Sequence, residues 1–189
     1  MHRKEKLWKI KKWLIILVIL ILLLAYVTFD RYYPIRYIDI INECAEEYGF
    51  TQEFIFSVIH AESKFNEEAV SKKDACGLMQ ITESTAYWLA KETNIENFDY
   101  NQIFDPEINI RLGCYYLYKL EKQFNDMDVA LSAYNAGSGN VENWLKNPEY
   151  SDDGKTLKYI PFQETRDYVK RVSDNQKIYA YILKVKHLL

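Results

Sequence analysis

The chain of 189 residues carries 24 basic and 27 acidic side chains, and its formal net charge at pH 7 is −3. This length suffices for one domain with a sizeable core and a short additional segment. Residues 13–189 hold 18 basic against 26 acidic side chains. Because nucleic-acid phosphates require a basic surface, this acidic balance argues against a nucleic-acid partner.

The N-terminal segment has the pattern of a membrane anchor. Residues 1–12 contain six basic side chains and one acidic one, and residues 13–29 contain none of either sign. The apolar run approaches the length that spans a bilayer, and Trp13 and Tyr26 are residue types that favour its two interfaces. Since basic residues stay on the cytoplasmic side, we expect the N-terminus in the cytoplasm and the chain after the anchor on the outer side of the cell membrane.

This pattern predicts a single-pass membrane protein with four segments. They are a cytoplasmic basic segment (1–12), a transmembrane anchor (13–29), a tether (30–35) and an extracytoplasmic domain (36–189). A cleavable signal peptide has the same order of charge and apolar residues, with a shorter apolar core. No Ala-x-Ala site follows the run, and no cysteine stands directly after it for lipid attachment. We therefore expect an uncleaved anchor.

The cysteines and histidines do not predict a metal site. Cys44, Cys76 and Cys114 have no metal-ligand spacing and no C-x-x-C pair, and the three histidines are scattered. At most one intramolecular disulfide could form. The simpler expectation is that the cysteines are small buried residues, with Cys76 near the functional site. We expect neither a metal nor a cofactor.

Beyond the tether, apolar periodicity predicts an all-α domain of several short helices that form a compact globule with a cleft. The expected helices are 37–48, ended by Gly49; 51–62, capped by Thr51; 82–93, capped by Thr82; 105–124, started by Asp105-Pro106-Glu107; 128–136, ended by Gly137; 138–145, capped by Ser138; and 163–185. The helix over 105–124 is expected to be the central hydrophobic rod, and 66–76 and 147–160 are expected to be loops.

One carboxylate stands out in the helix over 51–62. Ile55, Val58, Ile59 and Glu62 are spaced i, i+3, i+4 and i+7, so a helix places three aliphatic side chains and one acid on the same face. Desolvation raises the pKa of such an acid, as does the negative end of the helix dipole if the helix stops near Ser63. A carboxyl group protonated near neutral pH can donate a proton. The alternative is that Glu62 only marks the solvent edge of an amphipathic helix.

Four sequence blocks follow one another: Glu-Ser-Lys-Phe at 62–65, Gly-Leu-Met-Gln-Ile at 77–81, Ala-Tyr-Asn-Ala-Gly at 133–137, and Ile-Pro-Phe-Gln-Glu-Thr-Arg-Asp-Tyr-Val at 160–169. In this order and at these intervals they resemble the catalytic domain of the soluble lytic transglycosylase family, relatives of goose-type lysozyme. The resemblance extends over about residues 40–185 and implies a lysozyme-like fold. The chain departs from the family pattern at Glu67, Asp74 and Glu83, which puts substrate preference in doubt more than the reaction.

The resemblance implies cleavage of the β-1,4 bond between N-acetylmuramic acid and N-acetylglucosamine in peptidoglycan. In this family the muramoyl 6-hydroxyl attacks the anomeric carbon and leaves a 1,6-anhydro end. Glu62 would protonate the leaving oxygen and then act as the base. The residues implied to contact or border the substrate are Ser63, Ser71, Met79, Gln80, Tyr134, Asn135 and Tyr168; Ser71 and Tyr168 would also lie near Glu62, and Met79 and Gln80 would line the sugar cleft.

The residues leave two alternatives to a transglycosylase. A muramidase on the same scaffold would admit water and leave a reducing end; the presence of only one motif carboxylate on an apolar helix face favours the one-acid mechanism. A non-catalytic wall-binding or assembly protein is the other alternative, and the presence of Glu62 argues against it. The expected partners are peptidoglycan glycan strands and the membrane, and a role beside cell-envelope machinery stays open.

Overall fold

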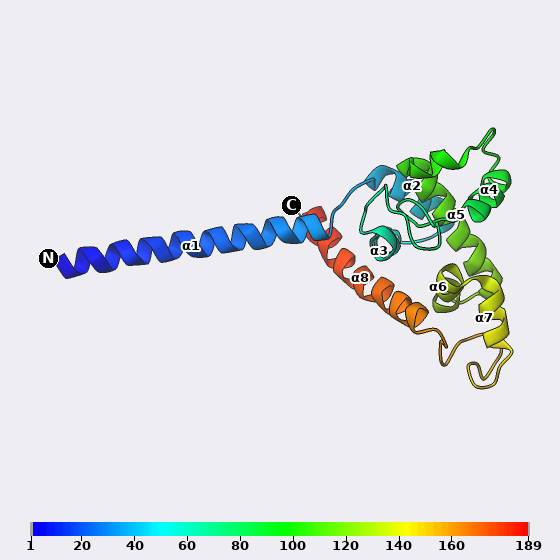
Figure 1. Cartoon of the computed structure of the whole chain (residues 1–189). Coiled ribbons are helices and arrows are strands. Elements are labelled where there is room, and N and C mark those ends of the chain that lie inside the picture. Colours follow the sequence, from blue (N-terminus) through cyan, green and yellow to red (C-terminus); the bar gives the residue numbers. More distant parts are fainter. Residues whose placement is uncertain (1, 189) are drawn as a thin grey trace. The chain divides into compact units, whose positions relative to one another are not determined.

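The computed structural model describes the backbone of residues 2–188 and the side chains of Trp8 and of residues 11–186. The chain divides into two compact units, Met1–Ile35 and Arg36–Leu189. The first consists of helix α1, and the second holds the remaining helices (Figure 1).

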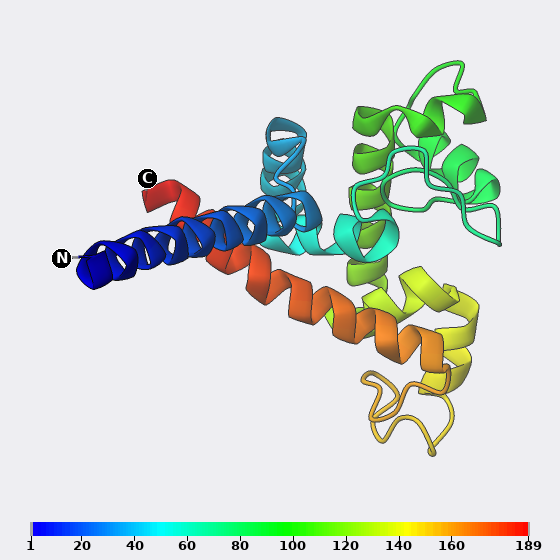
Figure 2. The ribbon, with the colours of Figure 1, turned by 60° about the vertical axis from the view of Figure 1, so that its left-hand side comes forward.

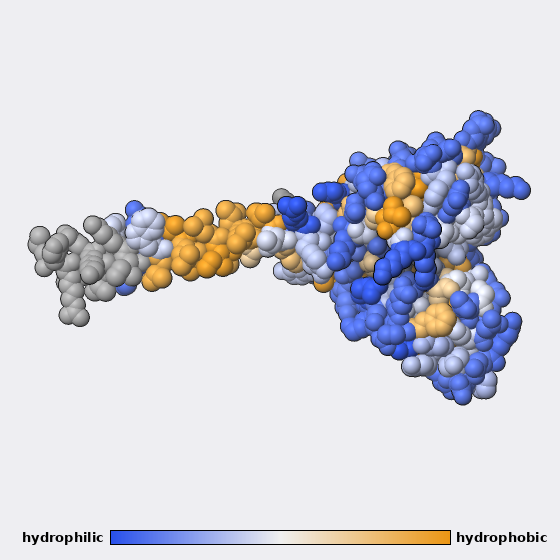
Figure 3. Space-filling view, viewed as in Figure 1, coloured by the Kyte–Doolittle hydropathy of each residue, from blue (hydrophilic) through white to orange (hydrophobic). Residues whose placement is uncertain are grey.

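Helix α1 (His2–Tyr32) contains the predicted anchor. By length and composition its stretch Lys11–Tyr32 could cross a membrane, and it is the one such helix in the described part of the chain. Figure 3 shows this stretch as a continuous apolar band. The helix does not end at Phe29 as expected but continues to Tyr32, so half of the predicted tether is helical.

The second unit is all-α, as predicted. Its elements are α2 (Ile38–Tyr48), α3 (Gln52–Ser63), α4 (Glu83–Glu92), the 3₁₀ helix η1 (Tyr100–Phe104), α5 (Pro106–Phe124), α6 (Met127–Ala136), α7 (Ser138–Leu145) and α8 (Gln163–Leu188). In the described residues the extended pairing is limited to isolated bridges of Cys76 with Val70 and with Ile81. The sequence did not predict η1, a short element started by a capping box between Asp99 and Gln102.

Local chemistry sets most helix ends. Gly49 ends α2 with φ of 74°, and the Thr51 hydroxyl accepts a hydrogen bond from the amide of Phe54 at the start of α3. One predicted cap is wrong, and another stands at the predicted N-cap position without the side-chain bond. Ser138 is the first residue of α7 rather than its cap, and Thr82 precedes α4 without a side-chain capping bond.

Helix α3 is buried along most of its length, whereas α5, which the sequence predicted as the central hydrophobic rod, contacts more of the other elements. Every residue from Phe54 to His60 is buried. Helix α3 packs against α8 and α2, whereas α5 contacts α2, α4, η1 and α6 and buries one face only. The views in Figures 1 and 2 both place α8 along α3. Glu62 follows this buried stretch, in the partly buried last turn of α3.

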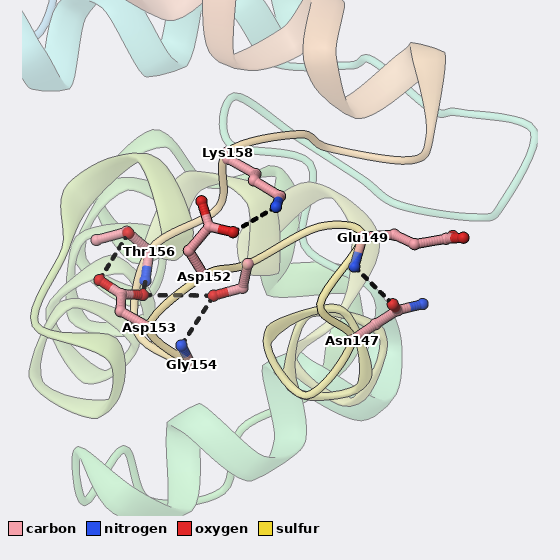
Figure 4. Close-up of polar contacts among 8 residues, drawn as sticks. Asn147, Glu149, Asp152, Asp153, Gly154, Thr156 and Lys158 are labelled. Carbon is pink, nitrogen blue, oxygen red and sulfur yellow. Dashed lines mark hydrogen bonds and ion pairs between the residues drawn. The ribbon is translucent and has the colours of Figure 1, made fainter.

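The predicted loop before α8 is ordered by its own polar groups (Figure 4). The Asp153 carboxylate accepts hydrogen bonds from the amides of Lys155 and Thr156, both at 2.8 Å, and these bonds lower its pKa to about 2. Lys158 pairs with Asp152, and the Ser151 hydroxyl accepts from the amide of Gly154. These contacts hold the loop that leads into α8 in one conformation.

The cap of α5 can be tested directly. The Asp105 carboxylate accepts from the amides of Glu107 and Ile108, at 2.9 and 3.1 Å. We expect Asp105→Ala to lower the free energy of unfolding by about 1 kcal/mol, because two helix-terminal amides lose their acceptor. Ser138→Ala, at a helix start without a side-chain cap, is the matched control and should change it by less than about 0.5 kcal/mol. Urea unfolding in detergent measures both; equal effects would contradict the assignment.

Candidate active site

Glu62 lies in the last turn of α3, which ends at Ser63 as the sequence suggested. The chain then turns sharply, because Lys64 and Phe65 both adopt left-handed backbone conformations with φ of 53° and 65°. The carboxylate therefore stands at the negative end of the helix dipole. Glu62 as a residue is half-buried, and the predicted apolar stripe of Ile55, Val58 and Ile59 beside it is fully buried.

The surroundings raise the pKa of Glu62 from 4.5 to about 7. Burial of the carboxyl group is the largest cause, and the negative charge of Glu164 acts in the same direction. The hydroxyl of Tyr168 and the positive charge of Arg171 lower the pKa and offset part of this rise. The group is thus close to half protonated at neutral pH, so it can both give up and take back a proton.

Tyr168 of α8 places a hydroxyl near this carboxylate. It is 1% exposed, and its hydroxyl has no partner of ordinary hydrogen-bond geometry among the described residues. The hydroxyl nevertheless affects the pKa of Glu62, so the two groups are close without being aligned. Burial, followed by the charge of Glu62, raises the pKa of Tyr168 well above its ordinary value. Tyr168 therefore keeps its proton and retains an unmet buried hydrogen bond.

Tyr134 of α6 connects the second sequence block, at 77–81, with the surroundings of Glu62. Its hydroxyl donates to the carbonyl of Met79 at 2.7 Å. Burial raises the pKa of Tyr134 well above its ordinary value, and the charge of Glu62 contributes. Tyr134 thus lies within the electrostatic field of Glu62.

The loop that carries the second sequence block is anchored by Asn109, a fully buried residue of α5. Asn109 Oδ1 accepts from the amide of Met79 at 2.7 Å, and Nδ2 donates to the carbonyls of Cys76 and Ile103 at 3.1 and 2.8 Å. Gly77 makes room for this amide, since a Cβ there would lie 2.1 Å from Asn109 Nδ2, and its φ is 79°. The glycine of the block is therefore required by a close approach.

Met79 itself is fully buried. Its side chain packs on α5 at Gly113, where a Cβ would meet Met79 Sδ at 2.3 Å. The expectation that the Met79 side chain lines a cleft is thus not met in this structure. Its peptide groups instead join Asn109 to Tyr134 through the amide and the carbonyl.

Gln80 and Ser71 stabilise the loop before this block. Gln80 Nε2 donates to the carbonyls of Ala69 and Gly77, both at 3.0 Å. Ser71 Oγ accepts from the backbone amides of residues 73 and 75 at 3.2 and 3.1 Å. Through these two bonds the Ser71 hydroxyl stabilises the backbone of the loop.

Asn135 and Ser63 differ in how far their side chains are already engaged. Asn135 Oδ1 accepts from the hydroxyl of Thr165, a buried residue of α8, at 2.8 Å, whereas its Nδ2 has no hydrogen-bond partner in the described part of the chain. Ser63 Oγ donates to the carbonyl of Ile59 at 3.2 Å within its own helix. Asn135 therefore keeps a donor for another molecule.

Sequence reasoning missed the supporting residues. Asn109 stands between apolar neighbours of a buried helix, which was a readable signal of a buried amide. Thr165 lies inside the fourth block but was not singled out. Arg171 and Glu164 act on Glu62 from α8 through charge alone, and Glu164 pairs with Lys73 of the loop at 3.7 Å.

The three cysteines are free and buried, as expected. Interaction between the thiols of Cys44 and Cys114 lowers the pKa of Cys44, whereas burial followed by the same interaction raises that of Cys114. Among the described residues, no cluster of three His, Cys, Asp or Glu side chains could hold a metal ion.

Comparison with known proteins adds independent information. The profile of the "Transglycosylase SLT domain" family matches residues 39–157. The soluble lytic murein transglycosylase of Escherichia coli K12 is 34% identical over 163 residues, which cover 85% of this chain and 25% of that protein. The membrane-bound lytic murein transglycosylase C of Edwardsiella ictaluri is 29% identical over 176 residues, covering 78% of this chain and 47% of that protein.

Solved structures agree with the sequence matches. An inactive mutant of the lytic transglycosylase Slt from Pseudomonas aeruginosa superposes with a TM-score of 0.72 at 34% identity, covering 82% of this chain and 25% of that one. The soluble lytic transglycosylase of Escherichia coli gives a TM-score of 0.70 at 31% identity, covering 80% and 25%. The chain thus spans a quarter of the length of its soluble relatives and about half that of the membrane-bound ones.

The role of Asn109 leads to a stability prediction. Asn109→Leu keeps a similar volume but leaves the amide of Met79 and the carbonyl of Ile103 without these partners, while the carbonyl of Cys76 keeps only its bond from the amide of Ile81. We expect the free energy of unfolding to fall by roughly 2–4 kcal/mol. Asn140→Ala removes an exposed bond to the Ala136 carbonyl that water can replace, and should change it by less than about 0.5 kcal/mol. Urea unfolding followed by circular dichroism compares them; a loss below about 1 kcal/mol for Asn109→Leu would contradict its anchoring role.

Proposed function

Because the chain belongs to the transglycosylase SLT family, we propose that it is a lytic transglycosylase that cleaves peptidoglycan glycan strands. The bond broken is the β-1,4 link between N-acetylmuramic acid and N-acetylglucosamine. The observation that carries this proposal is the single carboxyl group at the end of buried helix α3, whose pKa of about 7 suits a proton donor.

In the first step, protonated Glu62 gives its proton to the glycosidic oxygen as the bond to the anomeric carbon breaks. The leaving N-acetylglucosamine departs as an alcohol, and Glu62 becomes a carboxylate. Positive charge that develops on the muramoyl ring is stabilised by the N-acetyl oxygen of the substrate, as in other substrate-assisted enzymes. The hydroxyl of Tyr168 is available to hold that N-acetyl group, because it is buried beside Glu62 and lacks an aligned partner.

In the second step, the Glu62 carboxylate removes the proton of the muramoyl 6-hydroxyl as its oxygen attacks the anomeric carbon. The product is a 1,6-anhydro end, and Glu62 regains its proton for the next cycle. A separate nucleophilic carboxylate is not required. Glu164, which influences Glu62 by charge, has a side chain that is 71% exposed and paired with Lys73, which suits tuning rather than attack.

Substrate positioning is assigned to groups that retain hydrogen-bonding capacity. Asn135 presents Nδ2, while Thr165 fixes its orientation. Tyr134, Gln80, Ser71 and Ser63 border the strand in this proposal, and the buried Met79 acts through its peptide groups. We assign α1 to a single crossing of the cell membrane with the basic N-terminus in the cytoplasm, which brings the enzyme to the wall.

The central prediction concerns Glu62→Gln. A glutamine keeps the shape but cannot transfer a proton, so we expect cleavage to fall by about 10³-fold. The full chain in detergent is incubated with purified peptidoglycan, and the soluble products are identified by mass spectrometry. Glu53→Gln, in the first turn of the same helix, is the matched control and should cleave as the wild type does.

The products distinguish the competing functions. Anhydro-muropeptides from the wild type and the Glu53→Gln control, but not from Glu62→Gln, support the proposal. Reducing ends would identify a muramidase. Equal cleavage by Glu62→Gln would remove Glu62 from its role, and an absence of products from the wild type would favour a wall-binding protein.

A second prediction concerns pH. Glu62 must be protonated to act as the acid, so kcat/KM on soluble glycan strands should fall as the pH rises through about 7. Arg171 lowers the pKa of Glu62 and Glu164 raises it. Arg171→Gln should therefore move this alkaline limb to higher pH, and Glu164→Gln should move it to lower pH. Both groups are exposed, so shifts of roughly a few tenths of a pH unit are expected at low salt. Shifts in the same direction would contradict this electrostatic account.

A further inference from the structure

A cavity of about 580 Å³ lies between α4, α5 and the start of α7. It is lined by Trp88, Tyr116, Tyr118, Lys119, Leu120, Lys122, Gln123 and Ser138. Its size falls within the range of small-ligand sites, and its wall combines aromatic faces with a few polar groups, as such sites do. None of these residues belongs to the four sequence blocks.

The aromatic wall is continuous with the candidate active site. The ring of Trp88 meets Tyr116 edge to face, with centroids 5.8 Å apart and an interplanar angle of 89°. Tyr116 contacts Tyr134 with centroids 5.0 Å apart. Tyr134 in turn bonds the carbonyl of Met79 and lies in the field of Glu62. A line of ring contacts thus leads from the cavity to Tyr134, whose pKa is affected by the charge of Glu62.

Trp88 is 41% exposed, although a tryptophan side chain gains much free energy from burial. Its neighbour Tyr87 is similarly exposed, at 45%, but its ring contacts Phe98 instead and does not line the cavity. Polar groups flank the Trp88 side of the cavity. Lys119 is held in place by Glu92 at 2.9 Å, and Lys122 lies 5.3 Å from the centroid of the Tyr118 ring.

We propose that this cavity is a distal glycan subsite, where one sugar of the strand stacks on Trp88 several residues away from the bond that is cut. This inference rests on the proposed function and names a specificity determinant for it. The apolar face of a pyranose ring can stack on the Trp88 ring, which Tyr116 contacts in an edge-to-face arrangement. The side chains of Lys119, Gln123 and Ser138 can form hydrogen bonds with hydroxyl and N-acetyl groups. The subsite makes the enzyme prefer long strands over short fragments.

Binding is measured in the Glu62→Gln background, so that the strand is not cut. Isothermal titration of the full chain in detergent compares purified octasaccharide strands with the disaccharide peptide. We expect Trp88→Ala to weaken binding of the octasaccharide by about 3- to 10-fold and to leave binding of the disaccharide unchanged. Tyr87→Ala, the adjacent exposed aromatic outside the cavity, is the matched control and should change neither. Trp88→Phe, which keeps a stacking face, should recover part of the affinity.

Kinetics of the enzyme with Glu62 intact give a second readout. Trp88→Ala should raise KM for octasaccharides and leave kcat within about twofold. The reason is that a contact far from the cleaved bond stabilises the bound substrate and the transition state equally. Unchanged octasaccharide affinity in Trp88→Ala, or an equal loss in Tyr87→Ala, would overturn the subsite while wild-type cleavage still supports the proposed function. If the wild type neither binds nor cleaves strands, the proposed function and the subsite both fail.

Discussion

The buried amide of Asn109 is the interaction on which the site depends most. It bonds to three peptide groups, of which the carbonyl of Cys76 also accepts from the amide of Ile81, and so ties the loop at 77–81 to α5 and η1. Gly77 is required because the amide occupies the space of its Cβ. The Met79 peptide then carries this fixed position to Tyr134. A polar contact in the core thus determines where a surface site can form.

Glu62 depends on a different constraint, the burial of α3. A helix surrounded by apolar side chains presents its last turn to a region of low polarity, and this environment raises the pKa of the carboxyl group toward neutrality. Helix α8 adjusts the result, because it supplies the Tyr168 hydroxyl and the opposing charges of Arg171 and Glu164. It also orients Asn135 through Thr165. One helix therefore both covers α3 and tunes the acid at its end.

The arrangement separates rigid from accessible groups. Asn109, Met79 and Thr165 are buried and have partners. In contrast, the Nδ2 group of Asn135 retains hydrogen-bonding capacity and the ring of Trp88 is exposed, and both lie where a glycan strand would bind in our proposals. Such a division is expected of a site that holds a long polymer, since pre-organised groups lose little conformational freedom when the ligand binds.

The all-α class, most helix boundaries, the family and the position of Glu62 at a helix end could be predicted from the amino-acid sequence, because periodicity, caps and motifs are local properties. It did not reveal how completely the middle of α3 is buried, that Met79 faces the core, or that Asn109 and Thr165 support the site. Those features depend on contacts between residues far apart in the chain, such as the 30 positions between Asn109 and Met79. The direction of the pKa shift of Glu62 could be predicted from its place in the helix. The size of the shift also depends on Tyr168, Arg171 and Glu164 of α8, a helix far away in the sequence that packs against α3 in the folded chain.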